Sequence, residues 1–160
     1  MTRLPTLFVS HGSPMLALEP GTTGPVLTKV GERLPRPKAI LVISAHWLTH
    51  QPTLSSSKAP ETIHDFGGFP RALYSLQYPA PGSPELATQV QAMLKNIGLE
   101  AKLDEQRGLD HGAWVPLRYL YPQADIPVVQ LSLNPSVPPK LQFALGQFLQ
   151  NLSAEGVLIL

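Results

Sequence analysis

Residues 39–46 read AILVISAH and residues 7–11 read LFVSH, so two apolar runs each end in a histidine. Neither run alternates between polar and apolar residues, which is typical of strands covered on both faces in a parallel α/β sheet. The carboxyl ends of such strands open onto the crevice where these sheets bind ligands. We therefore expect His11 and His46 to meet there, where two imidazoles supply part of a metal site. The alternative is that each histidine only bonds a neighbouring loop.

The rest of the chain predicts helices that alternate with strands. Ser83 is a candidate N-cap, Pro84 suits a first helical turn, and Gly98 suits a helix end. The irregular stretch at residues 50–70 is too long for an ordinary connection, so it is either functional or carries short strands. The predicted strands lie at about residues 5–10, 39–45, 100–104, 126–133 and 156–160, and the predicted helices at about 26–34, 84–97, 113–121 and 140–152.

This order predicts an α/β fold with three layers, α/β/α, around a mixed, mostly parallel central sheet. The apolar runs are expected in the interior of that sheet, the first of them included. With 160 residues, the chain is long enough for one domain with its own core, and we take residues 1–160 as a single catalytic-type domain.

Composition excludes several classes of partner and site. The formal net charge is +1, and 14% of the residues are charged, which gives no electrostatic case for binding nucleic acid. No apolar run is long enough for a membrane span, and residues 1–5 lack the features of a signal peptide, so the expected location is cytoplasmic. The chain has no cysteine, so any metal must be bound by His, Asp, Glu or water.

The sequence finishes inside another apolar run, VLIL at residues 157–160. Chain ends are usually polar and frayed, so we expect this chain to be truncated at its carboxyl end. Loss of covering structure would expose apolar surface, which favours a homo-oligomer.

Four motifs follow one another along the chain: SHGSP at residues 10–14, SAHW at 44–47, DFGGFP at 65–70 and GLDHGAWVPL at 108–117. Together and in this order they resemble the LigB-type (class III) extradiol ring-cleaving dioxygenases, and within these the 4,5-DOPA extradiol dioxygenase group. The resemblance covers essentially the whole chain, but only the amino-terminal part of a typical family member. In the family, a further histidine and the last metal ligand lie in the part that would follow Leu160. We therefore expect residues 1–160 alone to cleave little catechol.

The resemblance implies metal-dependent extradiol cleavage of a catechol ring, DOPA-like, with dioxygen. It implies one ion per chain, Fe(II) or Zn(II), bound partly by His11 and His46. It also implies an active-site role for His111, whose ordinary pKa lies near working pH and suits proton transfer. The alternative for His111 is a loop histidine that caps the following helix.

Other residues of the motifs each allow two interpretations. Phe66 and Phe69 could face an aromatic substrate and Trp114 could shape the pocket wall, although core packing explains all three equally well. Asp110 either orients a neighbouring imidazole or caps the helix that follows it, and the cap is the preferred interpretation. His50 is expected to face solvent, and the resemblance assigns no role to His64.

Two other functions fit the same residues. A zinc hydrolase could use the same histidines at the strand ends. A non-catalytic, metal-binding remnant of the family would keep the fold without the chemistry.

Overall fold

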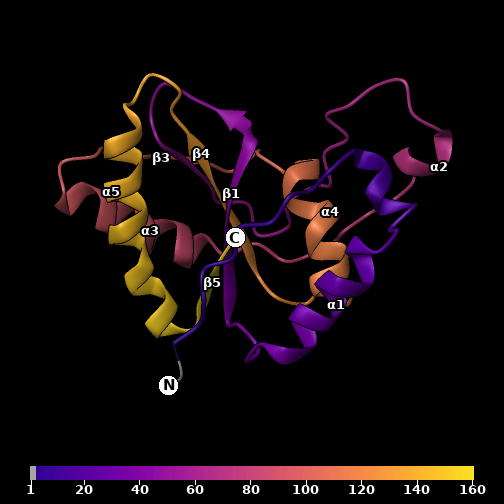
Figure 1. The fold of residues 1–160 in the computed structure, drawn as a ribbon. Helices are drawn as coiled ribbons and strands as arrows, with labels where there is room; N and C mark the ends of the chain where they lie inside the picture. Colours follow the sequence, from indigo (N-terminus) through magenta and orange to yellow (C-terminus); the bar gives the residue numbers. More distant parts are fainter. Residues whose placement is uncertain (1–2) are drawn as a thin grey trace.

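The computed structural model describes residues 3–160, and the residues before them lie outside the description. Five strands form one sheet in the order β3-β2-β4-β1-β5 (Figure 1). The strands are β1 (Ala39–Leu48), β2 (Thr53–Ser55), β3 (Lys102–Asp104), β4 (Val128–Leu133) and β5 (Val157–Ile159). The helices are α1 (Thr23–Arg33), α2 (Arg71–Tyr74), α3 (Pro84–Asn96), α4 (His111–Leu120) and α5 (Pro139–Leu149), with 3₁₀ turns at η1 (Pro14–Ala17) and η2 (Gln150–Glu155).

The sheet is mixed and mostly parallel. Strand β1 runs parallel to β4 on one side and to β5 on the other, and β2 runs parallel to β3. The one antiparallel junction, between β2 and β4, pairs Leu54 with Leu131. This arrangement confirms the predicted α/β fold with a mixed, mostly parallel sheet.

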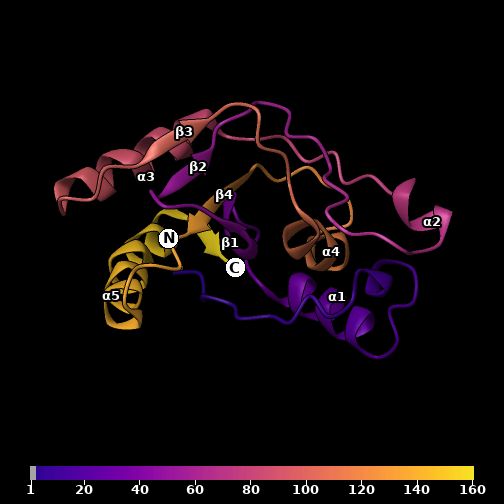
Figure 2. The same ribbon diagram turned by 90° about the horizontal axis from the view of Figure 1, so that it is seen from above.

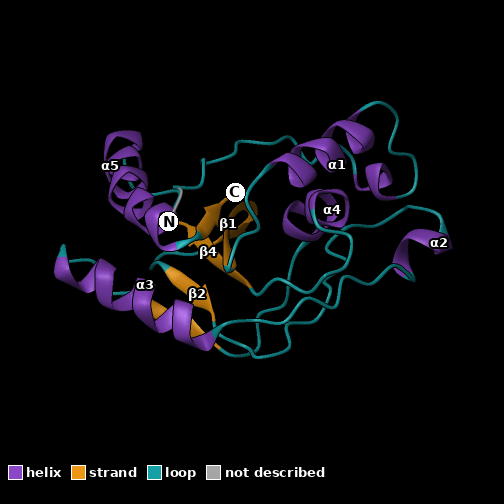
Figure 3. Ribbon diagram, turned by 90° about the horizontal axis from the view of Figure 1, so that it is seen from below, coloured by secondary structure: helices purple, strands orange, loops and turns teal. Residues whose placement is uncertain are grey.

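Helices cover both faces of the sheet, as seen from above and below in Figures 2 and 3. Helices α1 and α4 lie on one face, over Ile40 and Val42 of β1. Helices α3 and α5 lie on the other face, where α3 and the end of α5 pack over Leu41. Because neighbouring residues of a strand point to opposite faces, the unbroken apolar run of β1 supplies both cores at once.

Local signals explain where the long helices begin. The Ser83 hydroxyl accepts the backbone N–H of Leu86 at 3.1 Å and Pro84 opens α3, while Gly98, with a φ of 78°, follows its end. Pro139 likewise opens α5. No helix in residues 3–160 combines the length and the apolarity that crossing a bilayer requires.

The predicted interior strand at residues 5–10 is wrong. Thr6 forms one isolated parallel bridge with Ile159, and the N–H of Leu7 donates to the carbonyl of Ile159 at 2.9 Å. The segment therefore lies at the edge of the sheet beside β5, and no other described strand pairs with its outer side. Phe8 is fully exposed there, at 101%. An apolar run becomes an interior strand only when both of its edges are paired.

Candidate functional site

Three histidines lie together beyond the end of β5: His11, His46 and His111. The Nε2 atoms of His11 and His46 are 2.9 Å apart. The ring centroid of His111 is 4.9 Å from that of His11 and 4.0 Å from that of His46. One ring nitrogen from each histidine lies within 4.8 Å of the other two, so the three could bind one metal ion.

The topology explains how residues so far apart meet. His46 lies inside β1 rather than after it, and β5 separates β1 from the amino-terminal segment that carries His11, so the two histidines come from segments that are not neighbours in the sheet. At the end of β5 the N–H of Ile43 donates to the carbonyl of Leu160 at 2.8 Å, and His46 lies three residues further along β1. Gly12, with a φ of 61°, turns the chain directly after His11.

His111 is the first residue of α4 and is only 5% exposed. Its Nδ1 lies 2.8 Å from Oδ1 of Asp65, and its backbone N–H donates to the same oxygen at 3.0 Å. Partial burial raises the pKa of Asp65, but the two hydrogen bonds and the charge interaction with His111 outweigh it, so the net pKa of the carboxyl is lowered. Asp65 is therefore ionised at neutral pH, and the bond to Nδ1 leaves Nε2 of His111 available to a ligand.

Asp110 anchors the amino end of α4 from a fully buried position. Its Oδ1 accepts the N–H of Ala113 at 3.2 Å, which confirms the predicted helix cap. Its Oδ2 accepts from Arg107 at 2.9 Å and from the amide of Gln130 at 2.8 Å. These contacts fix the helix that carries His111. The carboxylate that touches an imidazole is Asp65, so the alternative role considered for Asp110 is not found in the structure.

An aromatic group borders His111 on the side of the loop at residues 64–76. The ring of Phe66 meets that of His111 edge to face, with centroids 5.6 Å apart, and Phe69 meets Phe66 in the same way at 5.5 Å. Trp114 has no exposed surface, and its Nε1 donates to the carbonyl of Ile63 at 2.9 Å. Trp114 therefore lies behind Phe66, with ring centroids 6.4 Å apart, and its full burial fits core packing rather than a place on the surface of a pocket wall.

The other two histidines lie outside the cluster. His50 is exposed, as expected. His64 is half-buried and its Nε2 bonds the carbonyl of Leu76 at 3.0 Å, which closes the loop at residues 64–76. The sequence offered no basis for this role.

The cluster fits a metal ion on its own chemistry. His11 and His46 bring two Nε2 atoms to the same point, and Nδ1 of His11 is buried without a hydrogen-bond partner among the described residues. Imidazole ligands suit iron and zinc alike. Metal-bound histidines commonly bond their other nitrogen to a carboxylate, as His111 does with Asp65, so geometry alone also allows His111 to be a third ligand.

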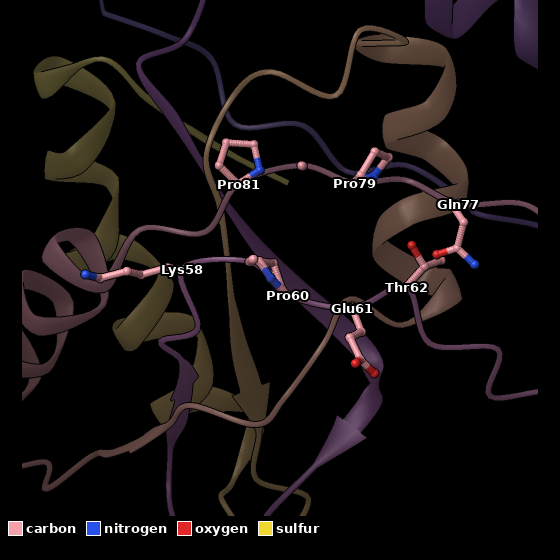
Figure 4. A pocket seen from close by; sticks show the side chains of 9 residues that line it. Lys58, Pro60, Glu61, Thr62, Gln77, Pro79 and Pro81 are labelled. Atoms are coloured by element: carbon pink, nitrogen blue, oxygen red, sulfur yellow. The ribbon is translucent and has the colours of Figure 1, made fainter.

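A cavity of about 690 Å³ lies elsewhere, between residues 58–62 and 77–81 (Figure 4). None of the five histidines lines it. The two segments are joined by hydrogen bonds from Gly82 to Lys58 and from Tyr78 to the Thr62 hydroxyl, both 2.9 Å. The size of this cavity does not by itself indicate a function, so we place the candidate site at the three clustered histidines.

Asp65 is the functional residue that the sequence did not single out. It lies within the DFGGFP motif, but its partner His111 is 46 positions further along the chain. A carboxylate in a motif that resembles an active-site loop was the available signal, and nothing in the spacing indicated which imidazole it would bond.

Comparisons with known proteins agree with this geometry. Residues 5–160 match the family model described as the catalytic LigB subunit of aromatic ring-opening dioxygenase. The chain is 48% identical to a 4,5-DOPA dioxygenase extradiol of Escherichia coli K12 over 99% of its own length and 58% of the relative's. It is also 48% identical to a protein of that name from Beta vulgaris, over 97% of its own length and 59% of the relative's.

A solved structure has the same fold. The crystal structure of an uncharacterized protein from Escherichia coli K12 superposes with a TM-score of 0.70 and 38% identity, covering 85% of this chain and 50% of that one. The chain thus spans about three fifths of the length of the curated relatives described above.

Proposed function

Because this chain belongs to the LigB family of aromatic ring-opening dioxygenases, we propose that the protein it forms cleaves a catechol ring by extradiol addition of dioxygen. The observation that carries the proposal is the convergence of His11, His46 and His111 at the end of β5. The substrate class is a catechol such as DOPA, as the names of the relatives suggest.

His11 and His46 would hold the ion, one per chain, through the two Nε2 atoms that face each other. Fe(II) is the proposed working metal, and Zn(II) suits the same imidazoles. When bound, the metal would hold both oxygens of the catechol and provide a place for dioxygen. Two neutral ligands add no negative charge to the site, and His46 is exposed, so a substrate can reach this side of the cluster.

His111 would transfer a proton to or from the substrate. Its Nδ1 is engaged by Asp65, so Nε2 is the atom that can act, and the His111 ring lies beside those of the proposed ligands. Phe66 and Phe69 would contact the aromatic ring of the substrate, since edge-to-face and stacked arrangements stabilise such pairs. Trp114 would hold Phe66 in place.

Several broader expectations are part of the proposal. Residues 1–160 would form one α/β domain or part of one, because the two apolar cores share a single sheet. A homo-oligomer is supported by the exposed Leu141 and Phe143 of α5, at 59% and 70%, and sedimentation would test it. The cytoplasmic location rests on the composition and is tested by cell fractionation.

The test uses the full gene product that carries residues 1–160. The protein is loaded anaerobically with Fe(II), mixed with DOPA or catechol, and exposed to oxygen, while oxygen uptake and the visible absorbance of the ring-opened product are recorded. We expect both signals with catechols and neither with resorcinol, whose hydroxyls are not adjacent and cannot bind one ion together. If the protein binds iron but leaves every catechol intact, the proposal fails, and ester hydrolysis with bound zinc is then measured to separate a hydrolase from a binding protein.

A further inference from the structure

The two ring nitrogens of His111 have different surroundings. Nδ1 meets Oδ1 of Asp65 at 2.8 Å, whereas no hydrogen bond from the described residues engages Nε2; one of the two nitrogens lies within 4.8 Å of ring nitrogens of both His11 and His46. The side chain of Asp65 is 23% exposed and that of His111 only 6%, so their bond is partly shielded from water. A hydrogen bond to an ionised acceptor is stronger than one between neutral groups.

One oxygen atom of Asp65 receives two donors, and this fixes the proton on the ring. The backbone N–H of His111 always donates, and it reaches Oδ1 at 3.0 Å. The ionised carboxylate has no hydrogen to donate, so Oδ1 is an acceptor toward the ring as well, and Nδ1 must carry the hydrogen of the neutral imidazole. Nε2 is then left with its lone pair, which is the form that a metal ion or an acidic proton requires.

Asp65 belongs to a loop that is fastened at its base. His64 bonds the carbonyl of Leu76 at 3.0 Å, and the N–H of Tyr78 donates to the hydroxyl of Thr62 at 2.9 Å. The same loop carries Phe66, whose ring edge meets His111. The carboxylate that bonds the imidazole and the aromatic ring proposed to meet the substrate are thus adjacent residues.

We propose that Asp65 is a positioning residue, which holds His111 as the Nδ1–H tautomer with Nε2 toward the His11–His46 pair and ties this orientation to the loop at residues 64–76. The consequence for catalysis rests on the proposed function, but the tautomer does not. A substrate that contacts Phe66 would also contact the loop that holds His111, so substrate binding and the orientation of the His111 imidazole would be linked.

Histidine tautomers are measured directly in the metal-free protein by long-range ¹⁵N–¹H correlation at pH about 8, where an ordinary imidazole is neutral. His111→Gln identifies the signals of His111 by their loss. We expect a protonated Nδ1 and an unprotonated Nε2 in the native protein, the opposite of the form that free histidine favours in water. A native spectrum with the proton on Nε2 overturns the proposal.

Variants separate the hydrogen bond from a general effect on folding. Asp65→Asn should keep the Nδ1–H tautomer, because the backbone N–H of His111 holds the amide oxygen toward the ring. Asp65→Ala should move the ring toward the Nε2–H form, and an unchanged spectrum contradicts the proposal. Glu61→Ala is the matched control, since Glu61 is an exposed carboxylate four residues away whose side chain makes no recorded hydrogen bond to the cluster. If Asp65→Ala does not fold, the native and Asp65→Asn spectra still decide the assignment.

Kinetics test the link to the reaction. In the iron-loaded full gene product, Asp65→Ala should lower kcat about 10–100-fold with a smaller change in KM, as expected when a residue that orients an active imidazole is lost. Phe66→Leu should mainly raise KM. If Asp65→Ala and Phe66→Leu both lower kcat/KM equally, and only by raising KM, the link is contradicted. If no catechol is cleaved by any form, the proposed function fails, while the tautomer result for Asp65 stands independently.

Discussion

The Ser44 hydroxyl donates to Oδ1 of Asp110 over 2.7 Å, which joins the strand that carries His46 to the helix that begins at His111. The same hydroxyl oxygen accepts the backbone N–H of His46 at 3.2 Å. Two of the three clustered histidines are therefore held through their backbone or their helix by a pair of buried polar side chains, at 4% and 0% exposure, whose hydrogen bonds do not involve the imidazole nitrogens. The precision of the site depends on this buried network as much as on the histidines.

Asp110→Ala should destabilise the fold by about 3–5 kcal/mol, because it leaves the guanidinium of Arg107 and the amide of Gln130 without their buried acceptor. It also removes the cap of α4. Urea unfolding followed by circular dichroism measures the change. Asp125→Ala is the control, since Asp125 pairs with Arg36 on the exposed surface, and it should cost far less stability than Asp110→Ala. Equal losses of stability in the two variants would show that the buried network contributes no more than a surface ion pair.

Gly112→Ala should damage the site by steric contact. A Cβ at this position would lie 2.5 Å from Oγ of Ser44 and 3.0 Å from Cδ2 of His46. Overpacking of this kind costs about 1–3 kcal/mol, and here it should also displace His46 and weaken metal binding. Gly146→Ala is the matched control, because it lies in α5 with nothing within 4 Å, and it should stabilise the protein by about 0.5–1 kcal/mol. Unchanged stability and metal affinity in Gly112→Ala would mean that the strand and the helix can move apart freely.

The sequence predicted best the features that depend on residues close together in the chain. The cap of α3 by Ser83 and the cap of α4 by Asp110 follow from side chains that bond N–H groups three residues away, and both are confirmed. The apolar runs of β1 and β4 predicted buried strands, and these form the centre of the sheet. In both cases the information lies within a few residues.

What the sequence could not supply is the partner of each segment. The apolar run at residues 7–10 predicted an interior strand, yet this segment lies at the edge of the sheet. Its pairing depends on strands that are distant in the chain, which a local pattern does not show. The bond between Asp65 and His111 spans 46 positions, and no local pattern reports it. His11 and His46 were correctly expected near one another, but only the fold showed that β5 lies between the two segments that carry them.

Stability should fall at high pH through Tyr78. Burial, followed by the negative charges of Asp125 and ionised Tyr121, raises the pKa of Tyr78 above its ordinary value of 10.0. Because the folded-state pKa is the higher one, the stabilisation is complete below pH 10 and is lost as the pH rises above that value toward the folded-state pKa, with a slope of up to about 1.4 kcal/mol per pH unit. Tyr78→Phe should flatten this decline in urea unfolding between pH about 8 and 11.

The same variant has a separate cost at neutral pH. The Tyr78 hydroxyl donates to the carbonyl of Tyr121 at 2.9 Å, so its loss should cost about 1 kcal/mol at pH 7. Tyr119 and Tyr121 also have raised pKa values, so part of the decline should remain. Parallel stability curves for the native protein and Tyr78→Phe would show that Tyr78 is not the titrating group.

Metal binding separates the roles of the histidines. His11→Ala and His46→Ala should each weaken binding of Fe(II) or Zn(II) by more than the roughly 10–100-fold that follows loss of an outer hydrogen-bond partner, because each removes a ligand atom. His111→Ala should retain one ion per chain if His111 transfers protons, and should lose affinity to a similar degree if it is a third ligand. His50→Ala is the control, since His50 is exposed and outside the cluster. Equilibrium dialysis with elemental analysis gives the stoichiometry of each variant, and full metal content in both His11→Ala and His46→Ala would place the site elsewhere.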